Sequence, residues 1–430
     1  MPRFVVMLAC SVLPAALVPG VGHSGTLAGG YYLHDRILEP QIVDPSGLHL
    51  PAYDVSISDG VALVGAPELL AFDNGFGHAY LYNSYTGALL HTLTSNSDVD
   101  PSFGRAVALD DGYAVVSATF ATYVYDADSA TLLHILPGSI SVDIDNGRVI
   151  LASRNEGASV FDLASGSQLS TINSRATDVA LSGDYAIVTD ITYVHSDAKP
   201  GSGSAIVFDW KSGEQLYDLT PGGIPAGAGF GISVAADGHI VAVGAVKDPV
   251  PRSGRAYLFD LSTGESLFRI DGPTGILLTD FGSFVAVRGD MIFVAAPSQS
   301  VDFPLDASVG TSRDSNHGTV YAFSVETGKE AARFTVPLMS AGGNERYGFS
   351  IDYDGHQLIA GTLGWPKNAY ITDFPIPEPS TANLLSFAAL ALLVPCQKRC
   401  GMSQRLRMKI KRNAVGQSLD PSCDSQQQFT

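Results

Sequence analysis

A unit of four short strand-like runs recurs along this chain, and this repeat limits the fold more than any other feature of the sequence. The most complete copy runs from Phe230 to Ile270. In it, Asp237-Gly238 separates two runs of small and β-branched residues, and a second turn at 262–264 separates an aromatic run from a last apolar run. Small antiparallel sheets that repeat in this way are typical of circular arrays of blades.

The first hairpin turn of the unit occurs seven times, each time between two strand-like runs. The seven turns are Asp59-Gly60, Asp111-Gly112, Asn146-Gly147, Gly183-Asp184, Asp237-Gly238, Gly289-Asp290 and Asp354-Gly355. Gly, Asn and Asp tolerate the positive φ angles that two-residue type I′ hairpins require at both central positions. We therefore predict an all-β fold, a seven-bladed β-propeller of four-stranded blades that spans residues 31–374.

A second turn follows the aromatic strand of most units and usually has the sequence Thr-Gly or Ser-Gly. Its copies are Thr86-Gly87, Ser129-Ala130, Ser165-Gly166, Ser212-Gly213, Thr263-Gly264 and Thr327-Gly328. The earlier strands of each unit are rich in Val, Ala and Gly, whereas the later ones carry Tyr, Phe and Leu. Small residues toward the centre and large ones toward the rim fit the taper of a propeller blade.

The seventh unit ends before a fourth strand. It runs from Tyr347 to Ile371 and contains only three strand-like runs. A separate strand-like stretch, residues 36–42, precedes the first blade. We expect this stretch to supply the missing outer strand and to close the ring, because an unpaired sheet edge invites aggregation.

Residues 1–25 have the organisation of a secretory signal peptide. Arg3 provides the charged start, and apolar residues dominate from Phe4 to Val18. Cys10 also suggests a lipoprotein signal, but the apolar run before it is short for that class. We therefore predict that the protein is exported.

At the other end of the chain, Pro377-Glu378-Pro379 is followed by an apolar run from Leu384 to Val394 and then by a basic cluster. This order closely resembles the PEP-CTERM sorting signal of bacterial exported proteins. The resemblance implies a bacterial protein whose motif is recognised and cleaved by a membrane-embedded exosortase, with release or transfer to the cell surface. A plain C-terminal membrane anchor without cleavage is the alternative. We assign residues 375–399 to the sorting signal with its short apolar segment and residues 400–430 to a basic, disordered tail.

The charge of the chain disfavours some classes of partner. It contains 25 Lys and Arg against 43 Asp and Glu, a net charge of −18, and seven of the basic residues lie from Lys398 onward. Such a field disfavours nucleic acid and anionic membrane surfaces, so we expect membrane contact only through the C-terminal segment. The cysteines all lie in the end segments, so packing between blades must stabilise the propeller without disulfides. They are Cys10, Cys396, Cys400 and Cys423.

The cassette that begins at Phe230-Gly231 and ends in Gly-Ala at 244–245 resembles the FG-GAP repeat of integrin-α-like propellers. The resemblance implies an adhesion-type propeller and, in many members, a calcium loop of the Asp-x-Asp-x-Asp-Gly type. Here that loop is reduced to a two-residue turn with one carboxylate at most, whereas calcium needs several oxygen ligands. We therefore predict no metal site and no cofactor. Weak cation binding at acidic pairs, such as Asp143 with Asp145, is the open alternative.

An enzyme is the alternative to a binding protein. Residues 320–330 also resemble the repeat of quinone-dependent propeller dehydrogenases, but the docking tryptophan of those repeats does not follow the glycine turn here. The sequence contains no His-x-x-x-His spacing and no Gly-x-Ser-x-Gly elbow. We therefore name no catalytic residue. A quinone-dependent dehydrogenase or a glycan-active enzyme would need a site over the central channel.

The connections differ in length between the two faces of the predicted disc. In an up-and-down blade, the first and third connections lie on one face, while the second connection and the link between blades lie on the other. The short turns all belong to the first face, and long segments such as 190–203 and 297–317 belong to the second. Insertions concentrated on one face of a repeat array often mark a binding surface, although tolerated loop variation is the alternative.

We predict that the face with the long segments binds the ligand. The aromatic and polar residues expected to be exposed there are Arg313, Asp314, Asn316, His317, Asn344, Arg346 and Trp365. The leading interpretation of the chain is a non-enzymatic, exported propeller of the cell envelope. It would bind a polysaccharide or another envelope protein, as an adhesion or extracellular-matrix protein does.

Overall fold

The computed structural model describes most of residues 31–374. The undescribed residues within this range are 33, 39–51, 68–76, 96–99, 101, 193–201, 223, 226, 248–252, 274–278, 300–315, 337–344 and 364–367. The predicted signal peptide, sorting signal and basic tail lie outside the described residues. In the part of the chain that is described, no helix is long and apolar enough to cross a membrane.

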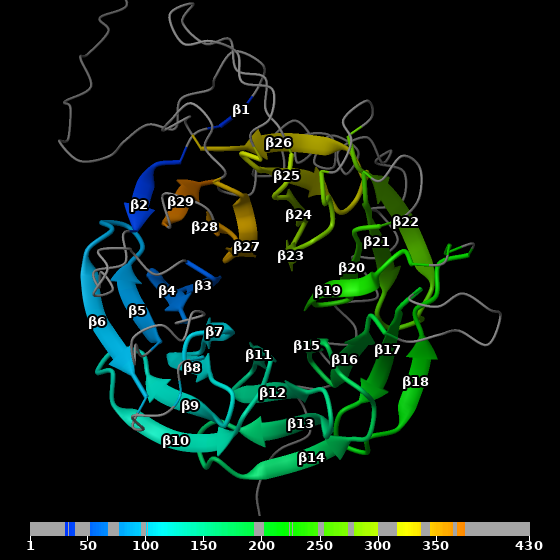
Figure 1. Cartoon of the computed structure of the whole chain (residues 1–430). Coiled ribbons are helices and arrows are strands. Elements are labelled where there is room, and N and C mark those ends of the chain that lie inside the picture. Colours follow the sequence, from blue (N-terminus) through cyan, green and yellow to red (C-terminus); the bar gives the residue numbers. More distant parts are fainter. Residues whose placement is uncertain are drawn as a thin grey trace, which may run out of the picture. The chain divides into compact units, whose positions relative to one another are not determined.

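Seven antiparallel sheets form a ring around a central channel (Figure 1). Blade one contains β3 (Asp54–Ser58), β4 (Val61–Ala66), β5 (His78–Asn83) and β6 (Leu89–Thr94). Blade two contains β7 (Val107–Asp110), β8 (Tyr113–Ser117), β9 (Ala121–Asp126) and β10 (Leu132–Pro137). Blade three contains β11 (Ser141–Asp145), β12 (Arg148–Ser153), β13 (Gly157–Asp162) and β14 (Gln168–Ile172).

The next three blades follow the same order, with the first strand at the channel and the fourth at the rim. Blade four contains β15 (Asp178–Ser182), β16 (Tyr185–Asp190), β17 (Ser204–Asp209) and β18 (Gln215–Asp218). Blade five contains β19 (Phe230–Asp237), β20 (Ile240–Ala245), β21 (Arg255–Asp260) and β22 (Ser266–Asp271). Blade six contains β23 (Val285–Arg288), β24 (Met291–Ala296), β25 (Thr319–Ser324) and β26 (Glu330–Phe334). The predicted seven-bladed, all-β propeller of four-stranded blades is confirmed.

The N-terminal segment closes the ring on blade seven. This blade contains β27 (Tyr347–Tyr353), β28 (Gln357–Thr362) and β29 (Ala369–Asp373), and its outer strand is β2 (Arg36–Leu38), antiparallel to β29. The predicted closure is therefore confirmed for residues 36–38, while 39–42 lie outside the described residues. A second strand was not predicted: β1 (Tyr31–Tyr32) adds in parallel to β26 of blade six. We call β1 and β2 together the strap.

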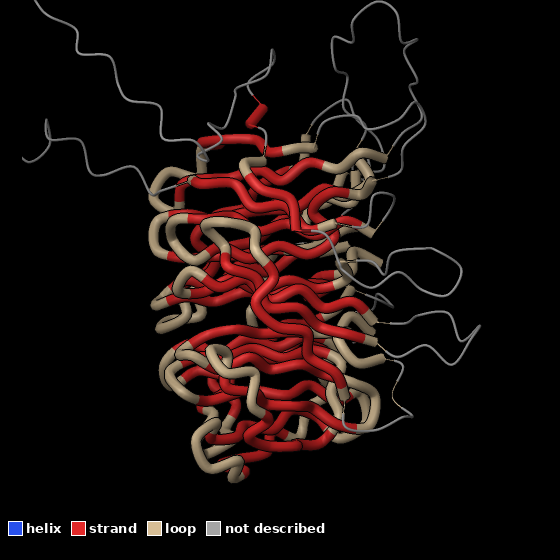
Figure 2. Tube along the Cα trace, turned by 90° about the vertical axis from the view of Figure 1, so that its left-hand side faces the viewer, coloured by secondary structure: helices blue, strands red, loops and turns tan. Residues whose placement is uncertain are grey.

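Each junction between neighbouring blades has its own apolar core. Seven buried clusters are found in the described residues, and each joins side chains of two adjacent blades. In the junction between blades two and three, for example, Val115 and Val124 pack against Val149 and Phe161. The burial of these surfaces stabilises the ring through the hydrophobic effect. Figure 2 shows the stacked strands from the side, with the described loops along both faces of the ring.

The first hairpin turns of blades one to six are of two kinds. In blades one to three both central residues have positive φ, as at Asp59 (50°) and Gly60 (81°), which is the predicted type I′ pattern. In blades four to six only the first central residue does, namely Gly183, Gly238 and Gly289, which is the pattern of a type II′ turn. The prediction for blade five was wrong by one residue: Asp237 pairs with Ile240, so the turn is Gly238-His239.

Candidate functional site

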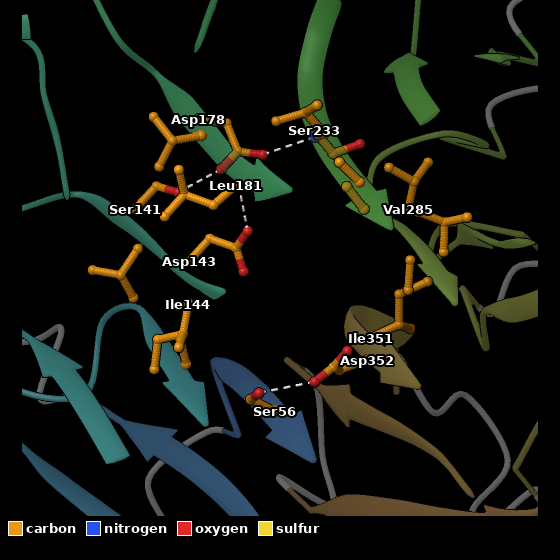
Figure 3. A pocket seen from close by; sticks show the side chains of 18 of the residues that line it. Ser56, Ser141, Asp143, Ile144, Asp178, Leu181, Ser233, Val285, Ile351 and Asp352 are labelled. Carbon is orange, nitrogen blue, oxygen red and sulfur yellow. Dashed lines mark hydrogen bonds between the residues drawn. The ribbon is translucent and has the colours of Figure 1, made fainter. Parts of the chain in front are cut away.

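The central channel is a cavity of about 750 Å³ lined by the first strands of all seven blades (Figure 3). Its lining includes only two arginines, Arg105 and Arg288, and a much larger set of aspartates. The eight aspartates are Asp54, Asp110, Asp143, Asp145, Asp178, Asp237, Asp352 and Asp354. The acidic charge of this chain is therefore partly gathered along its centre, which the sequence analysis did not predict.

Four of these carboxylates bind the free edges of the neighbouring first strands, namely Asp54, Asp143, Asp178 and Asp352. A first strand has a partner on one side only, so some of its backbone N–H groups need other acceptors. The N–H of Val107 donates to Asp54 Oδ2 at 2.7 Å, and that of Leu181 donates to Asp143 Oδ2 at 2.7 Å. Asp178 Oδ2 likewise accepts from the N–H of the next blade's first strand, at 2.9 Å. Each aspartate thus joins its own blade to the next.

Serine hydroxyls extend these contacts across a further blade. Ser350 of blade seven donates to Asp54 Oδ1 at 2.6 Å, while its own oxygen accepts the N–H of Val55 at 3.2 Å. Ser56 of blade one donates to Asp352 of blade seven at 2.8 Å. Ser141 of blade three donates in the same way to Asp178 of blade four (Figure 3). We call the set the channel belt: Asp54, Ser56, Ser141, Asp143, Asp178, Ser350 and Asp352.

The channel belt has no member in blades two, five and six. Its members occupy two fixed positions on the first strand. In blades one, three and four, these positions lie two and four residues before the last residue of that strand. In blade two these positions hold Ala106 and Ala108, and in blade six they hold Phe284 and Ala286. Neither blade offers a carboxylate or hydroxyl there. In blade five the earlier position holds Ser233, whose hydroxyl donates instead to the Gly282 carbonyl at 3.1 Å, so the belt forms two separate arcs.

Burial in the channel wall changes the acidity of the belt. Desolvation raises the pKa of Asp143 to about 8, that of Asp54 to about 7 and that of Asp178 to about 6, despite the opposing effect of their hydrogen bonds. Burial also raises the pKa of Asp352. Burial therefore favours the neutral carboxylic acid form of these side chains over the charged form.

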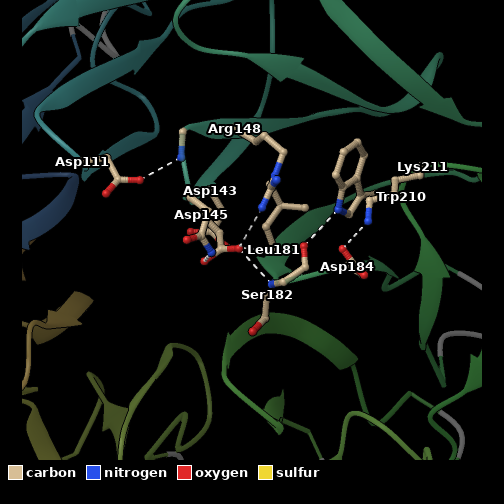
Figure 4. A network of polar contacts seen from close by, with 12 residues as sticks. Asp111, Asp143, Asp145, Arg148, Leu181, Ser182, Asp184, Trp210 and Lys211 are labelled. Atoms are coloured by element: carbon tan, nitrogen blue, oxygen red, sulfur yellow. Dashed lines mark hydrogen bonds and ion pairs between the residues drawn. The ribbon is translucent and has the colours of Figure 1, made fainter. Parts of the chain in front are cut away.

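A polar network lies on the face of the ring that carries the short turns, at blades three and four (Figure 4). Trp210 is buried, and its Nε1 donates to the carbonyl of Gly183 at 3.0 Å. The Arg148 guanidinium lies 4.9 Å from the indole centroid, and Lys211 Nζ lies 5.6 Å from it. Lys211 also contacts Asp184 at 2.6 Å. These cation–π and ionic contacts hold the second turn of blade four against the first turns, so this side has a structural role.

The structure describes three of the seven residues predicted for the ligand face. Asn316, His317 and Arg346 lie together between blades six and seven, where the N–H of Arg346 donates to the Asn316 carbonyl at 3.0 Å. The other four lie outside the described residues: Arg313, Asp314, Asn344 and Trp365. The two blades therefore bring together residues that are far apart in the sequence.

The expectation that His317 is exposed was wrong. Its side chain is 3% exposed, and Nδ1 lies 2.5 Å from Oε2 of Glu345, which is fully buried. The sequence analysis missed Glu345. The corresponding junction of blades five and six has small residues, with Thr279 Oγ1 donating to the Ser253 carbonyl. A sequence alignment of these two junctions could have identified the His317–Glu345 pair, because both residues replace small ones there.

Metal ligation is not indicated in the part of the chain that the structure describes. No group of three or more His, Cys, Asp or Glu side chains has the arrangement to hold an ion there. The pair Asp143 and Asp145 is engaged with blade four, since Asp145 Oδ2 accepts the N–H of Gly183 at 2.9 Å. Both residues therefore have a structural use.

The comparisons with known proteins bear on blade five. Residues 214–259 match the FG-GAP repeat family. The chain contains an FG-GAP repeat. Comparison with curated proteins gives no match. Among solved structures, the computationally designed protein Ika8 is 14% identical and aligns with 80% of this chain and all of its own length, with a TM-score of 0.49.

The structure explains the two glycines of the FG-GAP repeat. In blade five, a Cβ on Gly244 would lie 1.9 Å from the carbonyl oxygen of Gly282, the Phe-Gly glycine of blade six. Gly282 itself has a φ of 85°. The ring of Phe230 packs edge-on against Tyr257 at 5.7 Å and fills the junction with blade four. The motif therefore sets the spacing between neighbouring blades through backbone contact.

Proposed function

We propose that the protein is an exported FG-GAP propeller of the cell envelope that binds a polysaccharide or another envelope protein and catalyses no reaction. One observation carries the proposal: the connections of the two faces are very unequal. Strands β3 and β4 are joined by two residues, Asp59 and Gly60, whereas β24 and β25 are separated by the whole segment between Ala296 and Thr319. A rigid ring with its long segments on one face suits binding.

The backbone at the junction of blades six and seven gives further support. Arg346 is only half-buried and has a φ of 50°, close to that of Asp280 (52°) at the equivalent position of blade six. The backbone conformation therefore belongs to the repeat, and blade seven differs in placing a long cationic side chain there. The buried His317–Glu345 pair beneath it fixes the two segments that carry Asn316 and Arg346.

The test is a binding screen of the purified full chain against immobilised glycans and envelope proteins. We expect any ligand found to lose at least about tenfold in affinity on Arg346→Ala or Trp365→Ala. The matched control is Glu265→Ala, an exposed residue in the second turn of blade five, on the opposite face. Equal affinity for all variants would place binding elsewhere and contradict the proposal.

We also propose that the C-terminal segment is processed by an exosortase-type enzyme in a bacterial host. The support is the order of the Pro377-Glu378-Pro379 motif, the apolar run and the basic cluster in the sequence. Mass spectrometry of the mature protein should then find a C-terminus near the motif, and Glu378→Ala should preserve the full length. A mature protein that keeps its tail would favour a plain membrane anchor.

An enzyme with a site over the channel is the less favoured alternative. The carboxylates that would serve as its acid and base are the members of the channel belt, and these are engaged with backbone amides of the adjacent blades. A general base needs a free lone pair within reach of its substrate. Visible absorbance of the purified protein would favour the hypothesis of a quinone-dependent dehydrogenase.

A further inference from the structure

The mouth of the channel on the face with the long segments is lined unevenly. Each first strand ends at a short turn of the opposite face, so the residues around its start lie at this mouth. Blades six, seven, one and two are neighbours in the ring and place Phe284, Phe349, Tyr53 and Arg105 in its lining. We call these four residues the mouth arc. Blades three, four and five place Ile140, Thr177 and Ile232 there. Aromatic side chains therefore line only one side of the mouth.

The three rings of the mouth arc contact one another in order around the channel. The ring centroids of Phe284 and Phe349 are 5.3 Å apart, and those of Phe349 and Tyr53 are 5.4 Å apart at an interplanar angle of 61°. All three side chains are only half-buried, unlike Phe230 and Phe281, which fill the blade junctions. The arc thus offers a continuous, partly exposed aromatic surface inside a cavity, as small-ligand sites commonly do.

Polar groups at the end of the arc have no partner in the described chain. The guanidinium of Arg105 makes no hydrogen bond or ion pair with any described residue, and neither does the hydroxyl of Tyr53. The other arginine of the channel differs, because Arg288 lies 3.8 Å from Asp237. A guanidinium has five donor hydrogens and a phenol can donate or accept. Both groups are therefore available to a ligand that lies on the rings.

The charges around the mouth restrict the class of that ligand. An anion would be repelled by a body of net charge −18 with eight aspartates in the channel lining. A cation would need free carboxylate oxygens, but Asp54, next to Tyr53, already binds the N–H of Val107 and the hydroxyl of Ser350. A neutral sugar ring meets both conditions. Its C–H face can pack on an aromatic ring, and its hydroxyls can bond to donors at the edge.

We infer that the mouth arc binds one neutral sugar ring of a polysaccharide, with the ring stacked on Phe349 and its hydroxyls bonded to Arg105 and Tyr53. The inference rests on the proposed function and specifies where the polysaccharide binds and which sugar class it contains. The cavity of about 750 Å³ has the size of a small-ligand site, so the end of a chain or a short branch can enter the mouth.

The experiment is isothermal titration calorimetry of the purified full chain with cellohexaose, mannohexaose and xylohexaose at up to about 1 mM. We expect at least one of them to bind, and Phe349→Leu and Arg105→Ala each to weaken its binding at least about tenfold. Phe349→Leu removes the ring but keeps an apolar side chain. Arg105 is half-buried and unpaired in the described chain, so its variant tests the arc even if Phe349→Leu unfolds the protein.

Matched controls make the same chemical changes on the same face, outside the channel lining. Phe120→Leu alters a ring that is 76% exposed between β8 and β9, and Arg154→Ala alters an exposed arginine between β12 and β13. Both controls should bind the hexasaccharide as the unaltered chain does. Equal losses in the arc variants and the controls would overturn the inference.

The other outcomes separate this inference from the proposed function. If Arg346→Ala abolishes sugar binding and the arc variants leave it unchanged, the proposed function stands and the arc is not its site. If no neutral hexasaccharide binds, the arc is not a sugar site, while the screen against envelope proteins still tests the proposed function. Tighter binding of the anionic hexagalacturonate or of a cationic chitosan hexamer would overturn the assignment to a neutral sugar.

Discussion

The inner and outer edges of the blades both leave backbone N–H and C=O groups without a strand partner, and different groups bind them at the two edges. The first strand of each blade has no strand partner on the channel side, and the fourth has none at the rim unless another segment supplies it. Inner edges receive side-chain acceptors, as when Asp54 binds the N–H of Val107. Outer edges of blades six and seven receive whole strands, β1 and β2. Those of blades one to three receive neither.

The difference reflects the distance between neighbouring blades. Near the axis, first strands approach closely enough for one carboxylate to reach the next blade at 2.7 Å, as Asp143 does to Leu181. At the rim, longer side chains bridge the blades: His91 of β6 contacts the Asp128 carbonyl of blade two at 3.0 Å, and Tyr217 of β18 donates to the Ser262 carbonyl of blade five at 2.7 Å. These side chains reach the second turn of the next blade, whereas the outer edges of blades six and seven are paired by the strap.

Removal of the strap should have the largest effect on this comparison. Deleting residues 31–38 exposes the outer edges of two blades and removes Leu38, which is fully buried. We expect the free energy of unfolding to fall by about 3–5 kcal/mol, measured by urea denaturation. Arg36→Ala, which removes the ion pair with Asp373 and keeps β2, should cost no more than about 1 kcal/mol. An unchanged urea midpoint in the deletion variant would refute the role of the strap.

Loss of one acceptor from the channel belt should have the next largest effect. Asp54→Ala leaves the N–H of Val107 and the hydroxyl of Ser350 without their partner. We expect a loss of about 1–3 kcal/mol, because a buried donor is left unsatisfied. Asp54→Asn keeps an acceptor oxygen and should cost far less. If both variants lose the same amount, the carboxylate charge and not the hydrogen bond is what matters at this position.

The pH dependence of stability should separate the channel from the turns. Asp143 has a pKa of about 8 in the folded protein against an ordinary 3.8, so its contribution is complete below about pH 4 and is lost as the pH rises through 8. We expect a fall of about 1–2 kcal/mol between pH 6 and 8, and a smaller fall in Asp143→Asn. Chemical denaturation at a series of pH values measures both, and identical slopes would exclude Asp143 as the cause.

The turn aspartates should act in the opposite direction at low pH. A hydrogen bond from Ser129 lowers the pKa of Asp126, and Ser165 does the same for Asp162. Their contributions are present above the unfolded pKa and are lost as the pH falls through the folded one. Stability should therefore decline on both sides of a mildly acidic optimum.

A charge at the open rim should have the smallest effect on the stability of a single ring. Leu133 is 40% exposed, so Leu133→Lys should change the free energy of unfolding of the monomer by no more than about 0.5 kcal/mol. The measurement is urea denaturation of the purified protein. A loss above about 2 kcal/mol would mean that β10 packs against the body of the protein more than its exposure indicates.

Local signals carried the prediction of the fold. Turn residues such as Asp59 and Gly60 need a particular backbone conformation, so they locate the hairpins by themselves. The shift at blade five arose because Gly238 alone can supply the positive φ of a type II′ turn, and the Asp before it resembled part of the turn. Blade seven contains only three strand-like runs in sequence, so its missing fourth strand was predicted to come from elsewhere in the chain.

The channel belt and the buried pair could not be predicted in this way. Ser and Asp within a strand give no sign of facing a channel until the neighbouring blade is placed beside them. His317 and Glu345 are 28 residues apart and meet only because β25 and β27 belong to adjacent blades. The ligand-face prediction rests on loop length, which locates a face but does not settle the direction of each side chain.

The strap also affects the order in which the protein folds. Arg36 and Asp373 are 337 residues apart, so the outer strand of blade seven is among the first parts of the ring to be synthesised, and its partner β29 is the last. Contacts of such long range form late and slowly, because the chain between them must first be ordered. Any chain that stops before β29 keeps β2 without a sheet to join, so only a full-length propeller can close.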